Sequence, residues 1–502
     1  MSETIDRPLP LDAAPGDRPA VVRSGARRWV MLPALASLVA ALLLGVLSLP
    51  IQVISGRQVP GPGGWKEPAG RRLHVAPNGT AAGDGSAASP LDLVTALSAD
   101  SPVRPGDLVW LHGGRYVAPF TSELAGTADA PIVIRQFPGE RAIVDATGTA
   151  ESALFVRGQH VWFWGFEIRS DHPTRISNQP YSPEIRRGAG VTAHAPGVKL
   201  INLVVHDMSI GLEVWASSPD AEVYGNLVYH NGYAGPDRGH GHGIYAQNRD
   251  GSQVYGDNIL FGGFGHGIHV YGSGAAYLNN VRLEGNVVFN SGLLSPQFER
   301  NILLGGGRLA ENPTLVDNYT YYSRDRRGGE NNVGFAAGCT GATVRGNYLA
   351  HPQQYPLVIP DNCVGAVSGN VMIGFVSNEF MTRFPDNDYR QTPGGVEVVV
   401  RPNRFEPGRG HIVVFNWDHH ASVEVRLDRL DLADGVTIDV HDAQDILAAP
   451  LYSGVYRTGQ SLTLPMAAAR ARIALPAGDV PLAAVHTGRE FGVFVVVPRA
   501  RR

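Results

Sequence analysis

Four short segments of one pattern bring together side chains that suit acid–base chemistry. They are "GVTAH" from Gly190, "GLEVW" from Gly211, "GIYAQ" from Gly243 and "GIHVY" from Gly267. In a β-strand, the residue after each inward aliphatic residue points to the opposite, outward face. The expected outward face therefore carries Thr192, Glu213, Tyr245 and His269, followed by His194, Trp215, Gln247 and Tyr271.

Titratable groups among aromatic rings on one exposed face suit stacking on sugar rings combined with proton transfer. We expect Tyr245 and His269 to act on one sugar as base and acid, with Glu213 orienting or donating. The expected substrate-binding residues are His194, Trp215, Gln247 and Tyr271. The alternative is a solvated face without a ligand, but such faces more often carry Thr, Ser, Lys or Asp.

His242 and His266 lie 24 residues apart, and each is followed by Gly and Ile. Stacked strands lie ~4.8 Å apart, so the two imidazoles can touch if the segments occupy consecutive layers. We include both among the candidate catalytic residues. The alternative is a structural pair of stacked histidines at a turn. No metal site is predicted.

Loops inserted before these segments are rich in arginine. They contain Arg175, Arg186, Arg187, Arg238, Arg300, Arg324, Arg326 and Arg327. Guanidinium groups match the geometry of carboxylates, so Arg238, Arg300, Arg326 and Arg327 are expected to bind an acidic substrate. The alternative is that they are surface arginines without a ligand.

A repeat must position these segments. Asparagine followed by one or two apolar residues recurs at Asn202, Asn226, Asn258, Asn286, Asn318, Asn347 and Asn370, at intervals of 24, 32, 28, 32, 29 and 23 residues. A β unit of this length cannot bury its own apolar face and must stack on neighbouring units. The expected fold is therefore an all-β solenoid with Val191, Leu212, Ile244 and Ile268 in one inward column.

This pattern resembles the right-handed, single-stranded parallel β-helix of the pectate-lyase-like superfamily, in which a buried asparagine ladder is typical. The segment 73–116 resembles the N-terminal lead-in of exported β-helix proteins, and 126–146 resembles the alginate-lyase and chondroitinase-B-like group. The segments "VVFNWDHHASVEVRLDRL" and "YSGVYRTGQSLTLPM" resemble the small antiparallel β-sandwich that follows many glycoside-hydrolase domains. Some members of the superfamily use Ca²⁺, but no acidic cluster marks a calcium site in this sequence, and no cofactor is predicted.

The N-terminal region contains an apolar segment, 29–54, without a charged residue. At ~1.5 Å per residue it can cross a bilayer as a transmembrane signal anchor. Three arginines precede it closely and one follows, so residues 1–28 are expected in the cytoplasm and the rest outside it. A cleaved signal peptide is the alternative. The remaining predicted parts are a linker (55–72), the β-helix (73–380), a second linker (381–395) and the β-sandwich (396–502).

Composition excludes some classes of function. The formal net charge of −4 gives no basic excess for binding nucleic acid. Lysine occurs only as Lys66 and Lys199, which makes a lysine base hard to place. The two cysteines, Cys339 and Cys363, precede Asn347 and Asn370 by 8 and 7 residues, so they fall at nearly the same position of consecutive coils. We expect a disulfide, with two buried free thiols as the alternative.

These observations predict a membrane-anchored protein that acts outside the cytoplasm on a polysaccharide, most simply one that contains uronates, by β-elimination or C5 epimerisation. Both reactions remove the proton next to a carboxylate. A glycoside hydrolase is the second enzyme class, with Glu213 and either Asp207 or Asp237 as its two carboxylates. A non-catalytic glycan-binding or envelope-scaffold protein would also satisfy the repeat.

Overall fold

The computed structural model of the protein describes residues 65–179, 182, 184–297, 299–324, 328–467 and 472–499, together with the backbone of Gln52 and Val53. The chain divides into a unit up to Ile51 and a second unit from Gln52 onward, and the described residues all lie in the second. Within the described ranges, no helix is both long and apolar enough to cross a bilayer. The predicted membrane segment 29–54 lies outside them except at its end, where Gln52–Val53 forms the short strand β1.

Three parallel sheets build the larger part of this unit, and most coils contribute one strand to each sheet. In the part of the chain that the structure describes, the nine-stranded sheet contains β5 (Phe120–Ser122), β8 (Leu154–Val156), β11 (Val191–Ala193), β14 (Leu212–Val214), β19 (Ile244–Ala246), β22 (Ile268–Val270), β25 (Ile302–Gly306), β29 (Asn331–Ala336) and β32 (Leu357–Val358). The eleven-stranded sheet contains β4 (Gly114–Val117), β7 (Ala142–Asp145), β10 (Glu167–Arg169), β13 (Val204–His206), β16 (Leu227–Tyr229), β21 (Ile259–Phe261), β24 (Val287–Phe289), β28 (Tyr319–Tyr321), β31 (Tyr348–Ala350), β34 (Val371–Ile373) and β35 (Asp388–Arg390).

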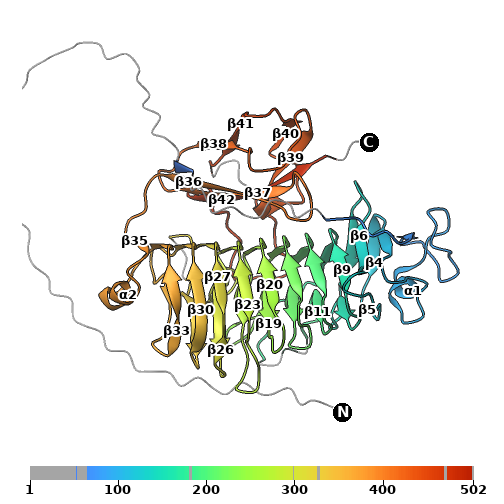
Figure 1. Ribbon diagram of the computed structural model, residues 1–502, viewed down its shortest axis with the longest axis horizontal. Helices are drawn as coiled ribbons and strands as arrows, with labels where there is room; N and C mark the ends of the chain where they lie inside the picture. Colours follow the sequence, from blue (N-terminus) through green and yellow to red (C-terminus); the bar gives the residue numbers. More distant parts are fainter. Residues whose placement is uncertain are drawn as a thin grey trace, which may run out of the picture. The chain divides into compact units, whose positions relative to one another are not determined.

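The twelve-stranded sheet completes each coil. It contains β2 (Arg72–Val75), β3 (Leu108–Leu111), β6 (Ile132–Gln136), β9 (Val161–Trp164), β12 (Lys199–Ile201), β15 (Glu222–Tyr224), β20 (Gln253–Gly256), β23 (Val281–Glu284), β26 (Ala310–Glu311), β27 (Thr314–Val316), β30 (Cys339–Arg345) and β33 (Cys363–Ser368) among the described residues. Figure 1 shows the coils stacked in chain order, from β4 and β6 to β30 and β33. This order of parallel strands fits the right-handed parallel β-helix that the sequence predicts.

The inside of the coils is apolar. Val191, Leu212, Ile244 and Ile268 are in register on neighbouring strands and are completely or almost completely buried in one hydrophobic core. This inward column is the one that the glycine–aliphatic pattern predicts. The helix α1 (Leu93–Leu97) adds Leu93 and Leu97 to the same core, near the first coils.

A ladder of buried asparagines joins consecutive coils. The Asn258 side-chain oxygen accepts hydrogen bonds from both the backbone N–H and the side-chain amide of Asn226, at 3.0 and 2.8 Å. The same pair of bonds links each step of the series Asn226, Asn258, Asn286, Asn318, Asn347, Asn370 and Asn387. Asn387 extends the ladder beyond the last position that the sequence pattern identified.

Asn202, which we expected in this ladder, lies one position earlier in its coil. The backbone N–H of Leu203, not of Asn202, donates to the Asn226 side chain. Asn202 instead adopts a φ of 49° at the turn where the next coil has Gly225 with a φ of 68°. Asparagine is one of the few residues that tolerate this left-handed conformation, so a turn asparagine was mistaken for a ladder asparagine.

The C-terminal part is antiparallel apart from the β1–β36 pair. Strands β1, β36 (Val396–Pro402), β37 (Gly410–Asn416), β42 (Phe491–Pro498), β39 (Thr437–Asp442) and β40 (Tyr452–Val455) form one sheet. A short 3-10 helix, η1 (Ala443–Asp445), follows β39, and a two-stranded sheet of β38 (Ser422–Arg426) and β41 (Ser461–Pro465) shares a core with the larger sheet.

This C-terminal layer covers the eleven-stranded sheet of the β-helix. Phe491 stacks on Tyr321 with the ring centroids 4.5 Å apart and meets Phe289 at 5.1 Å. Both partners lie on the outer face of the sheet and share a buried cluster with Phe415 and Trp417 of the C-terminal part. Because the outer face of these strands is buried, a ligand cannot bind there.

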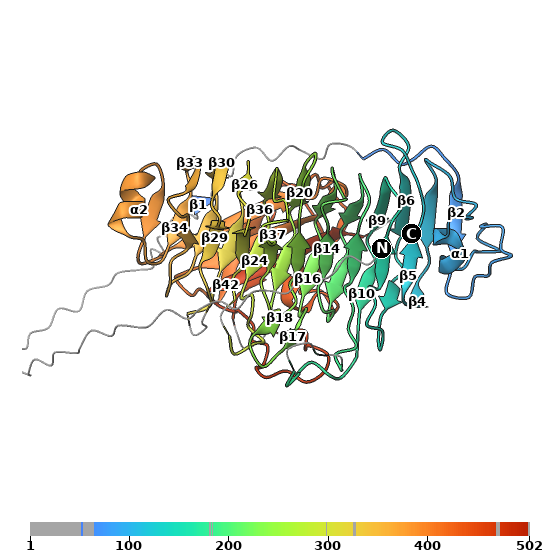
Figure 2. The ribbon, with the colours of Figure 1, turned by 90° about the horizontal axis from the view of Figure 1, so that it is seen from below.

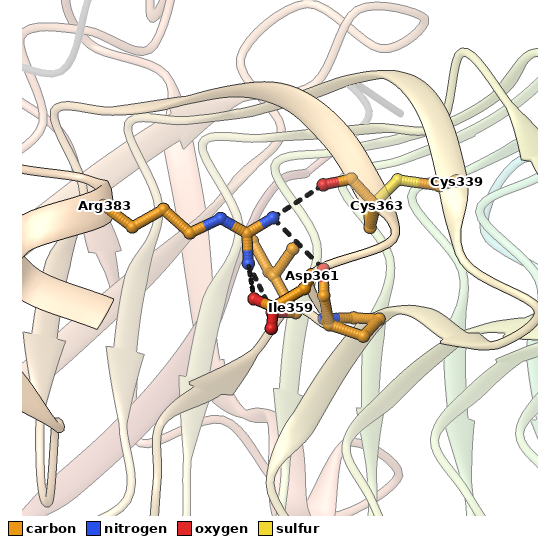
Figure 3. Close-up of a disulfide and its surroundings, with 6 residues drawn as sticks. Cys339, Ile359, Asp361, Cys363 and Arg383 are labelled. Carbon is orange, nitrogen blue, oxygen red and sulfur yellow. Dashed lines mark hydrogen bonds and ion pairs between the residues drawn. A yellow bond between two sulfur atoms is a disulfide. The ribbon is translucent and has the colours of Figure 1, made fainter. Parts of the chain in front are cut away.

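The last coils carry the disulfide. Cys339 on β30 and Cys363 on β33 are register partners, and their sulfur atoms are bonded, as their spacing predicts. Next to them, Arg383 at the end of α2 (Asn378–Arg383) donates hydrogen bonds to the carbonyl oxygens of Ile359 and Cys363 (Figure 3). The disulfide and the arginine together hold the end of the solenoid, where no further coil would do so.

Removal of this disulfide should lower the free energy of unfolding. It closes a loop with a sequence separation of 24 residues, for which the loss of chain entropy corresponds to about 3 kcal/mol. We expect Cys339→Ala/Cys363→Ala to lose about this amount in urea denaturation followed by circular dichroism. A reducing agent should shift the parent protein but not the double variant. Two alkylatable thiols in the denatured, unreduced protein would contradict this prediction.

Candidate functional site

The candidate site lies on the outer face of the nine-stranded sheet. The register pairs Thr192 with Glu213, Glu213 with Tyr245 and Tyr245 with His269 on the consecutive strands β11, β14, β19 and β22. Their neighbours along each strand are the buried aliphatic residues of the core, so these four side chains point outward. The structure therefore brings together the residues that the sequence placed in one outward column.

The column is less exposed than we expected. His269 retains only 8% of its surface, whereas Glu213 and Tyr245 are half-buried. The rings beside them account for this burial, because consecutive coils bring large side chains into contact. Trp215 lies 5.4 Å from Tyr245, and Tyr245 lies 5.7 Å from His269, between ring centroids.

A row of rings continues across the coils on both sides of this column. Towards the N-terminus, His194 stacks on Trp215 at 5.7 Å and on Phe155 at 5.3 Å. Towards the C-terminus, Tyr271 stacks on His269 at 4.8 Å. Such a row offers apolar faces with polar edges, which suits sugar rings. Gln247 lies within the row and donates to the Tyr245 hydroxyl at 2.8 Å.

Glu213 and Tyr245 form the centre of the row. The Glu213 carboxylate accepts a hydrogen bond from the Thr192 hydroxyl at 2.7 Å. Burial raises the pKa of Glu213, although this hydrogen bond opposes the effect. Burial also raises the pKa of Tyr245, and the hydrogen bond from Gln247 opposes it. A carboxyl group that burial makes more basic and a phenol that burial makes less acidic therefore lie side by side.

Three histidines meet at one end of this pair. The His242 Nε2 atom lies 2.9 Å from the His269 Nδ1 atom, and the rings of His242 and His266 stack at 5.3 Å. Burial lowers the pKa of His266 to about 3 and takes those of His242 and His269 well below their usual value. All three imidazoles are therefore neutral at physiological pH.

The histidines have a buried carboxyl group beside them that the sequence analysis missed. A Glu299 carboxyl oxygen lies 2.9 Å from the His266 Nδ1 atom, and burial raises the pKa of Glu299 to about 8. Glu299 lies in a loop that does not follow the repeat of the coils. Its only signal in the sequence is its position next to Arg300. A single carboxyl in a loop gives no sign of burial, so only the folded chain identifies it.

The two described arginines among those expected to bind substrate differ in their surroundings. Strands β17 (Tyr233–Ala234) and β18 (Gly239–His240) form a hairpin (Figure 2), and Arg238 lies in its turn. Arg238 is exposed and lies near enough to His269 and Glu299 to lower the pKa of both groups. Arg300 is half-buried and bound to Glu330 at 2.8 Å. Arg238 is therefore the more accessible cation, whereas Arg326 and Arg327 lie outside the described residues.

Two other loop arginines are structural. Arg175 is fully buried and bonds Asp207 at 2.6 Å, while Arg187 donates to the Ser170 carbonyl. Asp207 also bonds His206 at 2.7 Å and accepts the backbone N–H of Ala477. This buried cluster ties the β-helix to the C-terminal part. Asp207 is consequently not the second carboxylate that a hydrolase built on Glu213 would need.

Among the described residues, no group of three or more His, Cys, Asp or Glu side chains has the geometry to hold a metal ion. The three site histidines use their Nδ1 atoms within the protein, because His242 and His266 accept backbone N–H groups and His269 faces His242.

Comparison with known proteins gives similarity of fold. No protein-family model and no curated protein matches the chain. The solved structure of pectate lyase Pel9A is similar with a TM-score of 0.42 and 18% identity, over 62% of this chain and 78% of that one. An alginate lyase from Paenibacillus sp. str. FPU-7 has a TM-score of 0.39 and 17% identity, over 64% and 98%.

A glycoside hydrolase is similar to the same degree. The GH136 lacto-N-biosidase from Eubacterium ramulus has a TM-score of 0.41 and 16% identity, over 64% of this chain and 68% of that one. The structural neighbours thus include polysaccharide lyases and glycoside hydrolases with β-helix folds. At these identities the likeness concerns the fold alone.

The buried histidines should make the protein less stable in acid. His230, whose pKa burial lowers to about 4, is neutral in the folded chain, whereas the unfolded chain takes up a proton below pH ~6.5. Above pH ~6.5 the group is neutral in both states and costs no stability. As the pH falls below ~6.5, protonation of the unfolded chain lowers the free energy of unfolding. From these two values, the loss at pH 5 is ~2 kcal/mol for this one group.

The variant His230→Asn should reduce this pH dependence. Asn290 has a φ of 48° at the equivalent turn, so asparagine suits the φ of 53° at position 230. Urea denaturation at pH 5 and pH 7.5 should give a smaller difference in the free energy of unfolding for the variant than for the parent. An equal difference in both proteins would show that His230 does not contribute.

Proposed function

We propose that the protein acts on a uronate-containing polysaccharide by β-elimination. The observation that carries this proposal is the placement of a carboxylate and a neutral phenol, Glu213 and Tyr245, as register partners beside neutral imidazole donors and Arg238. Elimination from a uronate needs a base, an acid for the leaving oxygen and positive or hydrogen-bonding groups for the substrate carboxylate. This face offers all of them.

The proposed step uses Glu213 as the base and Tyr245 as the acid. The Glu213 carboxylate takes the proton from the carbon next to the substrate carboxylate. The electron pair of that C–H bond forms the C=C double bond while the C–O bond to the leaving sugar breaks. The Tyr245 hydroxyl protonates the leaving oxygen, and transfer of the proton from Glu213 back to Tyr245 restores both groups. This differs from the expected pairing of Tyr245 with His269, because a buried neutral imidazole is a poor acid.

Recognition of the carboxylate falls to Arg238 and His269 in this proposal. Arg238 is exposed and near enough to His269 to lower its pKa, and His269 is next to Tyr245 in the same column. A guanidinium and an imidazole N–H would neutralise the substrate carboxylate and stabilise the charge that develops when the proton leaves. The aromatic row would bind the neighbouring sugars.

The direction of attack favours elimination over C5 epimerisation. Glu213 and Tyr245 both rise from the same sheet, so they reach a bound sugar from one side. Epimerisation removes a proton from one face and returns one to the other, whereas elimination can use a base and an acid on the same face. We therefore expect activity on uronates whose proton and leaving oxygen lie on one face, such as 4-linked glucuronate or mannuronate.

The site of action in the cell is part of the same proposal. The apolar segment 29–54 would tether the protein with residues 1–28 in the cytoplasm and the folded part outside it. The Cys339–Cys363 disulfide supports an oxidising compartment. A polysaccharide of the cell envelope or the surroundings would then be within reach.

Activity on defined polymers tests the function. Purified full-length protein in detergent should release unsaturated products, followed by ultraviolet absorbance, from a glucuronate or mannuronate polymer and not from a neutral glucan. Reducing ends without this absorbance would indicate a hydrolase instead. Binding without turnover on every polymer would indicate a scaffold and would overturn the proposal.

Replacement of the acid or the base should abolish turnover. We expect Glu213→Gln and Tyr245→Phe to lower kcat by about 100-fold or more, because each removes one proton-transfer group. Circular dichroism should be unchanged, since both side chains point away from the core. Glu284→Gln, at a half-buried position, and Tyr355→Phe, at an exposed one, both away from this face, serve as matched controls. Full activity in Glu213→Gln or Tyr245→Phe would place the chemistry elsewhere.

Arg238→Gln should weaken binding of the acidic polymer. The group is exposed, so its attraction for a carboxylate is screened by salt. We expect KM to rise several-fold at low ionic strength and the difference from the parent to shrink at high salt. Arg249→Gln, which removes an exposed arginine paired with Asp250, is the control. A KM that is unchanged at low salt would exclude Arg238 from substrate binding.

A further inference from the structure

The glycine–histidine segments form a directed chain of hydrogen bonds. The backbone N–H of His266 donates to the His242 Nδ1 atom at 3.2 Å. A backbone N–H can only donate, so this Nδ1 atom carries no proton. The proton of the neutral His242 imidazole therefore lies on Nε2.

The tautomer of His242 determines that of the next ring, His269. The His242 Nε2 atom lies 2.9 Å from the His269 Nδ1 atom. Since Nε2 of His242 carries the proton, it is the donor, and Nδ1 of His269 is the acceptor. The proton of neutral His269 must then lie on Nε2. No described residue forms a hydrogen bond with that Nε2 atom, and the ring packs against Tyr245 and Tyr271 in the row.

The ring of His266 also accepts a hydrogen bond from a backbone N–H group. The N–H of Arg300 donates to the His266 Nδ1 atom at 3.0 Å, and the Glu299 carboxyl lies 2.9 Å from the same atom. An ionised carboxylate would repel the nitrogen lone pair at this distance. The raised pKa of Glu299, about 8 through burial, keeps the carboxyl protonated so that it too can donate.

The flanking glycines allow the close approach that this chain needs. A Cβ atom on Gly265 would lie 1.7 Å from the Gly241 carbonyl oxygen and 3.0 Å from the His242 Nδ1 atom. Any larger residue at position 265 would push the two turns apart and break the bond from the His266 N–H to His242. The repeated glycine–histidine pattern thus serves the hydrogen-bond chain as well as the turn.

We infer that His242 is a positioning residue that holds His269 as the Nε2–H tautomer, so that His269 serves as a hydrogen-bond donor to an anionic group of the substrate and not as a base. The identity of that anion, a uronate carboxylate, rests on the proposed function. The tautomer itself does not depend on it.

The neutral state of the rings is consistent with their charged neighbours. The groups that face them are Arg238, Arg300, His240 and Glu299, and the two arginines oppose a positive charge on the imidazoles. A neutral ring with a fixed proton has one donor and one acceptor. Its acceptor is already used by His242, which leaves only the donor for a ligand.

Nuclear magnetic resonance of the ¹⁵N-histidine-labelled protein tests the tautomer directly. Long-range ¹H–¹⁵N spectra separate protonated from unprotonated ring nitrogens, and the His269→Gln variant assigns the signals that disappear. We expect His269 to have Nε2 protonated and Nδ1 unprotonated throughout pH 6 to 8. A ring protonated on Nδ1, or one that becomes doubly protonated near pH ~6.5, would overturn the inference.

Two variants of His242 test its positioning role. The amide of His242→Gln can accept the His266 N–H and donate to His269, so we expect the Nε2–H tautomer of His269 to persist. His242→Leu can do neither, and the His269 signals should show a mixture of tautomers. An unchanged single tautomer in the leucine variant would overturn the role of His242, and if this variant fails to fold, the spectrum of the parent protein still decides the tautomer.

Kinetics connect the tautomer to the substrate. We expect His242→Leu to lower kcat/KM on the acidic polymer by about 10-fold, with His242→Gln close to the parent. A loss shared equally by both variants would overturn the positioning role. If no polymer is turned over, the proposed function fails while the tautomer measurement still stands, so the two failures are distinguishable.

Discussion

The buried asparagine ladder is the interaction on which the rest of this structure depends. From Asn258 onward, each ladder oxygen accepts two hydrogen bonds from the preceding coil, and each amide also donates to a strand carbonyl, as Asn226 does to Leu200. A shift of one residue would leave these buried groups without partners, at a cost of about 1–3 kcal/mol each. The ladder therefore holds the coils in one register, and this register makes Glu213, Tyr245 and His269 neighbours.

The face that is open to a ligand depends on what covers the other faces. The outer side of the eleven-stranded sheet carries a stack of its own, in which Tyr229 lies 5.1 Å from Phe261 and Phe261 lies 5.1 Å from Phe289. These rings would resemble a sugar-binding row if they were exposed. Phe491 and Phe415 of the C-terminal part bury them, so they stabilise the contact between the two parts. The row around Trp215 and Tyr245 lacks such a cover in the described part of the chain.

The local sequence pattern predicted the strand residues of the site, but it could not predict the roles of the loop residues. The glycine–aliphatic segments predicted the pairing of Glu213 with Tyr245 because strand alternation and coil stacking are regular. Arginines in the loops gave no comparable signal. Arg175 is buried against Asp207, whereas Arg238 is exposed, although both belong to insertions of similar composition. The path of each loop decides whether its arginine is buried or exposed, and no periodicity in the sequence predicts that path.

The sequence by itself determined the solenoid, the inward column and the neighbours within the outward column, because these follow from short periods that repeat coil after coil. It also determined the cysteine pair, since Cys339 and Cys363 occupy matching positions of adjacent coils. Tertiary structure alone decided the protonation of the site. The neutral histidines, the protonated Glu299 and the direction of the bonds from Arg300 to His269 arise from burial and from backbone N–H groups that approach across separate turns. Burial and such approaches depend on distances between residues far apart in the chain, which residue types and spacing do not specify.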